Sequence, residues 1–200
     1  MMDNRTKRYV VDRSHVPENY PTHCHSPAFW ESLGRAVATF GFLEEVIGKA
    51  VFALTATRPY SDKELEEAYE NWKPIIRQCL NGQLGGLIDT YQKALKDHPD
   101  STLSHPEDLA DKLREASRIR NVLCHGSWNA HPNEEGGSVP FFFDKKLLKL
   151  DTPVDVTFLD QTQKHTLSLI CDVMDSIMKM GLQFPGTSGP GRPIVQKKKP

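Results

Sequence analysis

The sequence predicts an all-α protein: a helical bundle with two long helices and a small β-hairpin insert before the last helix. Apolar residues recur at the spacing of an amphipathic helix along much of the chain, and proline or glycine separates these segments. Strand-like segments are too few for a sheet-based domain. We therefore expect an N-terminal arm over 1–26, a helical domain over 27–184, and a disordered basic tail over 185–200.

The first long helix is expected over 27–57, where apolar residues keep helical spacing through several turns until Pro59. At about 100° per residue, the charged residues fall on the opposite face of this helix. Glu44 is the exception, because it lies inside the apolar stripe. The apolar positions are Phe29, Leu33, Ala36, Val37, Phe40, Leu43, Ile47, Ala50, Val51 and Leu54.

Shorter helices are expected in the middle of the chain. Ser61 and Glu64 form a capping-box pattern for a short charged helix. Pro74 fits the first turn of the next helix, which should stop near Asn81. A further helix carries its apolar residues over 84–95.

The helix that follows is expected over 105–125. Ser104 and Glu107 form a second capping box before it, and Gly126 is placed as its C-terminal cap. The β-hairpin is expected beyond it, over 139–150 around a turn at Asp144-Lys145, and Thr157 is expected to start the last long helix.

The balance of charge argues against a general nucleic-acid binder. The formal net charge is −1, and the tail from Pro185 carries only basic charges, so the rest of the chain is net acidic. A general binder shows a basic body instead. Any contact with RNA is therefore expected at a local site.

Composition and termini point to a cytoplasmic protein that contacts no membrane. No apolar run is long enough to span a bilayer, and the N-terminus lacks the apolar region of a secretory signal. The dispersed cysteines, without a CxxC pair, indicate reduced thiols. The adjacent His23-Cys24-His25 fits metal-ligand spacings poorly, so we expect no metal and no other cofactor.

The segment Arg120–His125 carries the most specific pattern in the chain. On a helical wheel Arg120 falls within an arc of apolar residues, where a guanidinium is expected only if it is paired or meets a partner molecule. Asn121 and His125 are i,i+4 neighbours on the adjacent polar face. The apolar residues of the arc are Leu109, Leu113, Ala116 and Leu123.

Arginine, asparagine and histidine together are a workable set for cleaving a phosphodiester. His125 lies in the last helical turn, where the helix dipole favours an imidazolium, and it would move a proton on or off the 2′-hydroxyl or the leaving oxygen. Arg120 would stabilise the charge that develops on the phosphorane oxygens. Asn121 would orient the histidine or a phosphate oxygen. No metal is needed for these steps.

Arg120-Asn121-Val122-Leu123-Cys124-His125 resembles the signature of the HEPN family of small helical proteins. That signature is an Arg, a polar residue that is often Asn, a short spacer and a His near a helix end. Many members are metal-independent ribonucleases in toxin–antitoxin, defence or RNA-processing systems. The resemblance implies a helical bundle that forms a homodimer, with both Arg–His motifs in one shared cleft. Gly126-Ser127-Trp128 is similar to a common continuation of the motif, and the helix over 27–57 resembles the first helix of the family.

Residues beyond the motif add expectations of their own. One toxin branch of the family carries a Tyr two residues after the His, which a nucleotidyltransferase antitoxin modifies. Ser127 stands at that position, so this form of control is not expected. Trp128 either stacks on a base at the rim of the cleft or packs in the core. Of the three phenylalanines over 141–143, two are expected to pack on the bundle and one to be exposed.

We therefore expect a metal-independent endoribonuclease, a toxin or phage-defence effector whose partners are RNA, a second copy of the chain and an antitoxin or regulatory protein. The expected catalytic residues are Arg120, Asn121 and His125, with Glu44, Ser127 and Trp128 in support.

Two non-catalytic alternatives remain. The first is a HEPN-like dimer that binds RNA or a nucleotide, or that regulates a partner, without cleaving. The second is a purely structural interaction protein. In the simplest structural interpretation Arg120 pairs with a buried acid, most obviously Glu44, and His125 only caps its helix. That pairing is compatible with catalysis, because a carboxylate can hold an arginine in place.

Overall fold

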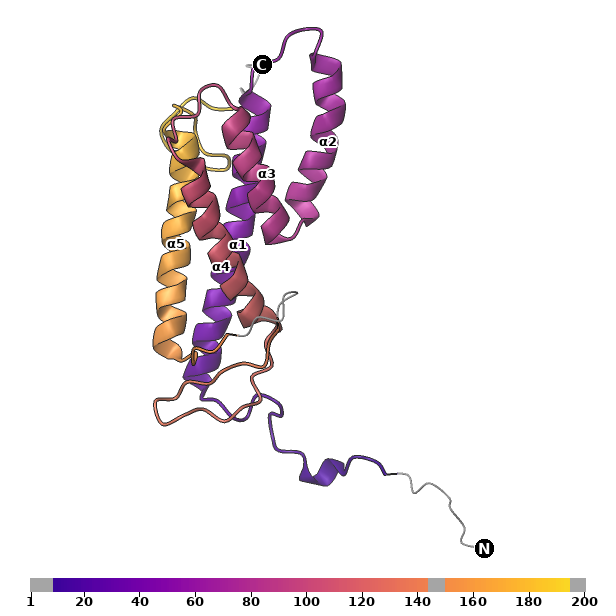
Figure 1. The fold of residues 1–200 in the computed structure, drawn as a ribbon, viewed down its shortest axis with the longest axis vertical. Helices are drawn as coiled ribbons and strands as arrows, with labels where there is room; N and C mark the ends of the chain where they lie inside the picture. Colours follow the sequence, from indigo (N-terminus) through magenta and orange to yellow (C-terminus); the bar gives the residue numbers. More distant parts are fainter. Residues whose placement is uncertain (1–8, 144–149, 195–200) are drawn as a thin grey trace, which may run out of the picture.

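The computed structural model describes residues 9–143 and 150–194, which form an all-α protein (Figure 1). A short 3-10 helix lies in the N-terminal arm at Arg13–His15. The α-helices of the described residues are α1 (Pro27–Thr57), α2 (Leu65–Asn81), α3 (Leu84–Asp97), α4 (Pro106–His125) and α5 (Val156–Met178).

Helix α1 is the centre of the bundle, since it contacts every other helix. Its most extensive contacts are with α5, which runs beside it in the same direction, and with α3 (Figure 1). Helix α4 runs the opposite way, so that its C-terminal end lies near the start of α1 and α5 (Figure 1). The loops over 126–143 and 150–155 gather at this same end (Figure 1).

The bounds expected for α1 are confirmed, and local chemistry explains them. Ser26 caps the N-terminus by accepting a hydrogen bond from the Phe29 backbone N–H at 3.3 Å, and Pro27 occupies the first turn. The helix spans 31 residues and stops just before Arg58 and Pro59. Its buried stripe includes Leu33, Phe40, Leu43, Ile47, Val51 and Leu54.

The two short helices expected between residues 61 and 81 are in fact one helix, α2, with Pro74 inside it. Proline removes the N–H that would bond the Glu70 carbonyl, but Glu70 and Pro74 are both exposed, so water can replace that bond. The predicted capping contact precedes the helix, because Glu64 Oε2 accepts from both the backbone N–H (3.1 Å) and the hydroxyl (2.6 Å) of Ser61.

Helix α4 has the bounds expected for it to within a residue, but its start is capped differently. His105 is the N-cap and makes no side-chain capping hydrogen bond, so the Ser104–Glu107 capping box is wrong. Pro106 in the first turn, together with Glu107 and Asp108 facing the positive end of the helix dipole, accounts for the start instead.

Helix α5 begins one residue earlier than expected. Asp155 is its N-cap and accepts from the Phe158 backbone N–H at 2.7 Å, so Thr157 lies inside the helix. At the other end Gly181 has a φ of 75°, a left-handed conformation that glycine adopts without strain.

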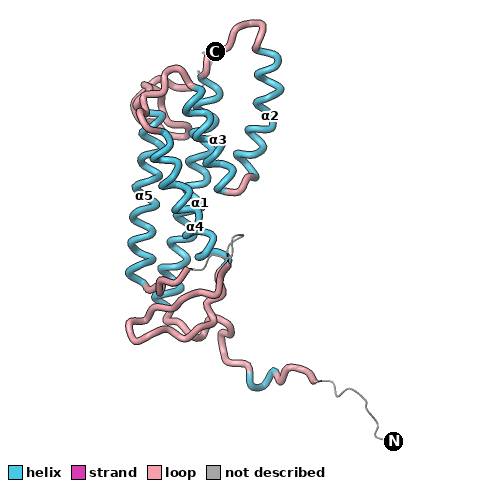
Figure 2. The backbone as a smooth tube through the Cα atoms, viewed as in Figure 1, coloured by secondary structure: helices cyan, strands magenta, loops and turns pink. Residues whose placement is uncertain are grey.

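The predicted β-hairpin is not supported by the described residues, which contain no strand (Figure 2). Its turn and nearly all of its second strand fall in 144–149, outside the described residues. The first half pairs with other segments, through isolated antiparallel bridges from Phe141 to Ser127 and from Ser138 to Val154. These bridges tie residues 138–141 to the loops on either side of them.

The segment expected to be a disordered tail folds back in its described part. Leu182 and Phe184 are buried in the core, and Leu182 forms an isolated bridge with Arg192. The Arg192 backbone N–H donates to the Gly181 carbonyl at 2.8 Å. The buried apolar side chains of Leu182 and Phe184 anchor the turn that precedes residues 185–194.

Candidate functional site

Glu44 and Arg120 form the centre of the candidate site, where α1 and α4 face each other. Glu44 Oε1 lies 3.2 Å from Arg120 Nη2, and the two side chains are 26% and 27% exposed. The sequence-based expectation that Glu44 pairs with Arg120 is confirmed. Each side chain thus provides the opposite charge for a group that would otherwise be unpaired on the apolar face of its helix.

The contact is an ion pair rather than an aligned hydrogen bond. Glu44 Oε1 is a buried oxygen that accepts no hydrogen bond of acceptable geometry among the described residues. Arg120 instead donates from Nη1 to Asn121 Oδ1 at 3.3 Å. The guanidinium is thus held by charge on one side and by the neighbouring amide on the other, and Asn121 is itself exposed.

Cys124 lies beside this ion pair but is poorly suited to act as a nucleophile. The thiol is half-buried, and burial raises its pKa. The positive charge of Arg120 lowers the pKa of Cys124 by favouring the thiolate, whereas the negative charge of Glu44 raises it further. The raised pKa keeps the thiol protonated, in line with a small packing residue.

His125 is the last residue of α4, and its side chain is exposed. It makes no side-chain hydrogen bond or ion pair with the part of the chain that the structure describes. The helix ends directly after His125, where the Gly126 backbone N–H donates a hydrogen bond to the Val122 carbonyl at 2.8 Å. The imidazole is therefore open to a ligand, at the negative end of the helix dipole.

Gly126 ends α4, but not through the left-handed conformation expected of a C-terminal glycine. Its φ of −69° and ψ of 142° are open to any residue. A Cβ at this position would instead lie 2.6 Å from the Val122 carbonyl oxygen and 2.9 Å from Pro140 Cβ. Glycine is thus required because the loop carrying Pro140 packs directly against the helix end.

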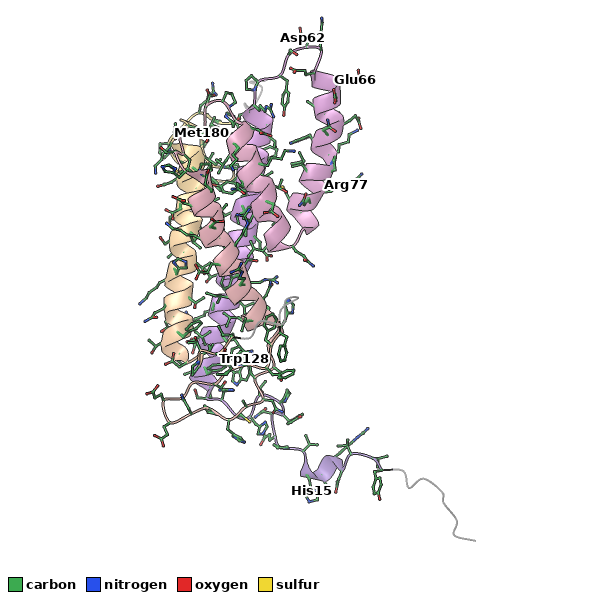
Figure 3. All side chains as sticks on the ribbon, viewed as in Figure 1. His15, Asp62, Glu66, Arg77, Trp128 and Met180 are labelled. Carbon is green, nitrogen blue, oxygen red and sulfur yellow. The ribbon has the colours of Figure 1, made fainter. Side chains whose placement is uncertain are left out.

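Of the two supporting residues after the motif, Ser127 is exposed and Trp128 is buried. The Ser127 backbone exchanges two hydrogen bonds with Phe141, of 3.0 and 2.9 Å. Trp128 lies at the end of the bundle where α1 begins (Figure 3). It is only 8% exposed and packs edge-on against Phe29, with ring centroids 5.3 Å apart. The prediction of Trp128 as a stacking residue at a cleft rim is therefore wrong, because its indole completes the core at this end of the bundle.

Sequence reasoning also missed His25, which joins the N-terminal arm to the loops near the site. Its ring stacks on Phe29 at 4.2 Å, and Nε2 lies 3.2 Å from the Ser138 hydroxyl. Burial lowers the pKa of His25, so the neutral form is favoured. The only sequence signal was its place just before the Ser26 cap, next to the aromatic pair Phe29 and Trp30.

The expected arrangement of the three phenylalanines is reversed. Phe141 is 72% exposed and Phe143 is 42% exposed, whereas Phe142 is half-buried. The exposed rings contact each other edge-on, with centroids 5.2 Å apart.

Two further features of the molecule lie away from the motif. Across residues 9–143 and 150–194, no three His, Cys, Asp or Glu side chains gather as metal ligands would, and Cys24 Sγ meets only His23 Nε2, at 3.5 Å, and the Asn129 carbonyl. A cavity of about 610 Å³ lies between α1, α2 and α3, with Trp72, Arg58 and Lys93 among its lining residues. It does not include any residue of the Arg120–His125 segment.

The structure defines an all-α helical bundle with an exposed histidine and a half-buried, carboxylate-paired arginine at the end of one helix. No helix of the described chain is long and apolar enough to cross a membrane. No protein-family model matches the chain, and no curated protein or solved structure is significantly similar to it.

Proposed function

We propose that the protein is a metal-independent endoribonuclease whose catalytic residues are Arg120, Asn121 and His125. The observation that carries the proposal is the contrast between two side chains in the last turns of α4. Arg120 is anchored by Glu44, whereas His125 is exposed and unpaired among the described residues. A fixed cation and an open imidazole at one helix end fit a group that stabilises charge and a group that moves a proton.

In the proposed reaction the 2′-hydroxyl of RNA attacks the adjacent phosphorus atom. The 2′-oxygen–phosphorus bond forms, the bond from phosphorus to the 5′-oxygen breaks, and the products are a 2′,3′-cyclic phosphate and a 5′-hydroxyl. His125 takes the proton from the 2′-hydroxyl, and the leaving 5′-oxygen takes its proton from His125 of a second copy of the chain or from water. Arg120 stabilises the negative charge on the phosphorane oxygens, and the exposed Asn121 orients the phosphate.

The proposed context follows the resemblance of Arg120–His125 to the HEPN signature. In that context the protein is a homodimer, acts in the cytoplasm as a toxin or phage-defence effector, and is held in check by an antitoxin or regulatory protein. Ser127 in place of the modifiable tyrosine argues for control by protein contact rather than by modification at that position.

The experiment is an RNA cleavage assay in EDTA with analysis of the product ends. We expect cleavage to persist without divalent ions and to leave 2′,3′-cyclic phosphate and 5′-hydroxyl ends. His125→Ala should abolish cleavage, whereas His165→Ala, at an exposed position of α5, is the matched control and should retain it. Strict dependence on a divalent ion would overturn the mechanism.

A non-catalytic RNA-binding or nucleotide-binding protein is the second candidate. One observation favours this second candidate. The thiol of Cys124, next to His125 in the chain, has a raised pKa and therefore does not supply a second proton-transfer group. Under this alternative the protein binds RNA through Arg120 without forming cyclic-phosphate ends. The same assay, run with a measurement of binding, separates the two functions.

A further inference from the structure

An exposed aromatic pair, Phe141 and Phe143, lies on the loop beside the candidate site. Phe141 is 72% exposed, although burying such a ring would remove a large apolar area from water. Phe143, at 42% exposure, meets it edge-on at 5.2 Å. Adjacent exposed aromatic rings on a loop are more typical of a contact surface than of a scaffold.

The backbone fixes Phe141 close to the motif. Because Ser127 and Phe141 exchange both backbone hydrogen bonds, their Cα atoms are about 5.5 Å apart. Ser127 is two positions beyond His125 in the chain, so Phe141 and His125 are held at one end of α4. The contact between Gly126 and Pro140 described above packs the two segments together.

The pattern of burial shows that Phe141 and Ser127 project to the same, outer side. Directly paired residues of an antiparallel bridge have side chains on one face, and neighbours along each chain alternate. Ser127 and Phe141 are exposed, whereas the next residue after Ser127, Trp128, and the residue before Phe141, Pro140, are buried. The aromatic ring thus stands on the solvent side beside the end of α4.

Helix α4 carries a polar stripe that ends at His125, two residues before Ser127. At 3.6 residues per turn, Arg118, Asn121 and His125 lie along one side of the helix, at i, i+3 and i+7. Arg118 is exposed and makes no ion pair within the described residues. A cation, an amide and an imidazole in line suit a sugar–phosphate backbone, with the aromatic ring at its end for a base.

We propose that Phe141, with Phe143 beside it, is a base-stacking platform and that the substrate of this site is single-stranded RNA. This inference rests on the proposed function, since it names the substrate class of the same site. The backbone runs along Arg118, Asn121 and His125, and a base near the phosphate at His125 stacks on the Phe141 ring. A duplex does not satisfy this arrangement, because its bases are already stacked on one another.

The test measures binding of a fluorescent single-stranded RNA to the full chain in EDTA, with His125→Ala present throughout to prevent cleavage. Adding Phe141→Ala should raise Kd roughly tenfold or more, and Phe141→Tyr should restore binding. Tyr69→Ala is the matched control, because Tyr69 is an exposed aromatic (55%) on α2, and it should leave Kd unchanged. The same RNA in a duplex should be insensitive to Phe141→Ala.

A second measurement reports stacking directly. With 2-aminopurine as one base of the RNA, binding to protein with Phe141 should change the emission, and Phe141→Ala should remove that change. If Phe141→Ala leaves Kd and emission unaltered, the inference is overturned. If it instead alters only the sedimentation of the protein, the patch is a protein contact, and the inference is equally overturned.

The outcomes also separate this inference from the proposed function. Binding that depends on Phe141, in a protein that never forms cyclic-phosphate ends, would refute the ribonuclease and support the stacking platform. Cleavage of single-stranded RNA with the same KM for Phe141→Ala and the unchanged protein would refute the platform and support the ribonuclease.

Discussion

Glu44 on α1 and Arg120 on α4 meet as an ion pair of 3.2 Å, with about three quarters of each side chain buried. Each residue places a charge on the apolar face of its helix, and the opposite charge of its partner compensates it. The pair fixes a guanidinium at the helix end that also carries His125. Its removal should therefore affect both the fold and the candidate site.

Glu44→Ala should lower the free energy of unfolding by about 1–3 kcal/mol, because it leaves a partly buried guanidinium without its carboxylate. The next residue supplies the control. Glu45 forms an exposed ion pair with Lys49 at 2.6 Å, and Glu45→Ala should cost about 0.5 kcal/mol or less. Denaturant unfolding of the two variants makes the comparison. Equal costs would mean that the Glu44–Arg120 pair contributes no more than a surface contact.

Gly126→Ala is the second prediction, and it tests the junction between α4 and the loop that carries Phe141. The added methyl group would meet the Val122 carbonyl oxygen at 2.6 Å and Pro140 Cβ at 2.9 Å, so backbone must move. We expect a loss of about 1–3 kcal/mol in the free energy of unfolding. Gly85→Ala is the control, since a Cβ there meets nothing within 4 Å. A Gly126→Ala protein as stable as the unchanged chain would contradict the close packing.

The third prediction concerns acid stability and His25. Burial lowers the pKa of His25 from the ordinary value of 6.5, so between its folded pKa and 6.5 the unfolded chain binds more protons. Stability should therefore rise with pH through this window and be lost as the pH falls below about 6.5. His98, whose pKa burial also lowers, contributes in the same direction.

His25→Gln should flatten part of this acid dependence, because glutamine carries no proton to bind. The measurement is the denaturant midpoint from pH 7.5 to pH 5, with His165→Gln at the exposed surface of α5 as the control for residue type. A His25→Gln protein that loses stability as steeply as the unchanged chain would show that His25 is not responsible.

The helices were predictable where a single periodic pattern decides the structure. The apolar stripe from Phe29 to Leu54 predicts α1, and the bounds expected for this helix agree with the structure. The charged residue inside that stripe, Glu44, was correctly predicted to pair with Arg120. Pro74 misled the prediction of α2, because a proline in a helix interior is tolerated where the freed carbonyl faces water. Local sequence does not reveal that exposure.

The loops beyond His125 were less predictable, because tertiary contacts decide them. Both Trp128 and Phe141 are aromatic, and nothing in their spacing says which one is buried. The pairing of Ser127 with Phe141, far apart in the sequence, turns Trp128 onto Phe29 and leaves Phe141 exposed. The same pairing uses the residues from which the hairpin was predicted.

The last prediction concerns assembly. The described chain offers one imidazole at the site, and a two-fold axis beside the end of α4 would bring a second copy. A competing surface exists on the other side of α1, where the exposed Phe42 (47%) and Leu167 (54%) border a shallow hollow of about 390 Å³. Phe42 and Glu44 are about 200° apart around the helix, so that surface faces away from Arg120.

We expect a homodimer joined at the end of α4, in which Arg120 and His125 of both chains line one groove. Phe42→Asp should then leave the sedimentation of the dimer unchanged, because the substitution lies outside the interface. Arg120→Ala and His125→Ala proteins, each inactive, should recover part of the cleavage activity when they are mixed and refolded together. If Phe42→Asp instead yields a monomer with full activity, each site is complete within one chain. The groove between subunits would then play no part in the chemistry, and Arg120 would have to act with His125 of its own helix alone.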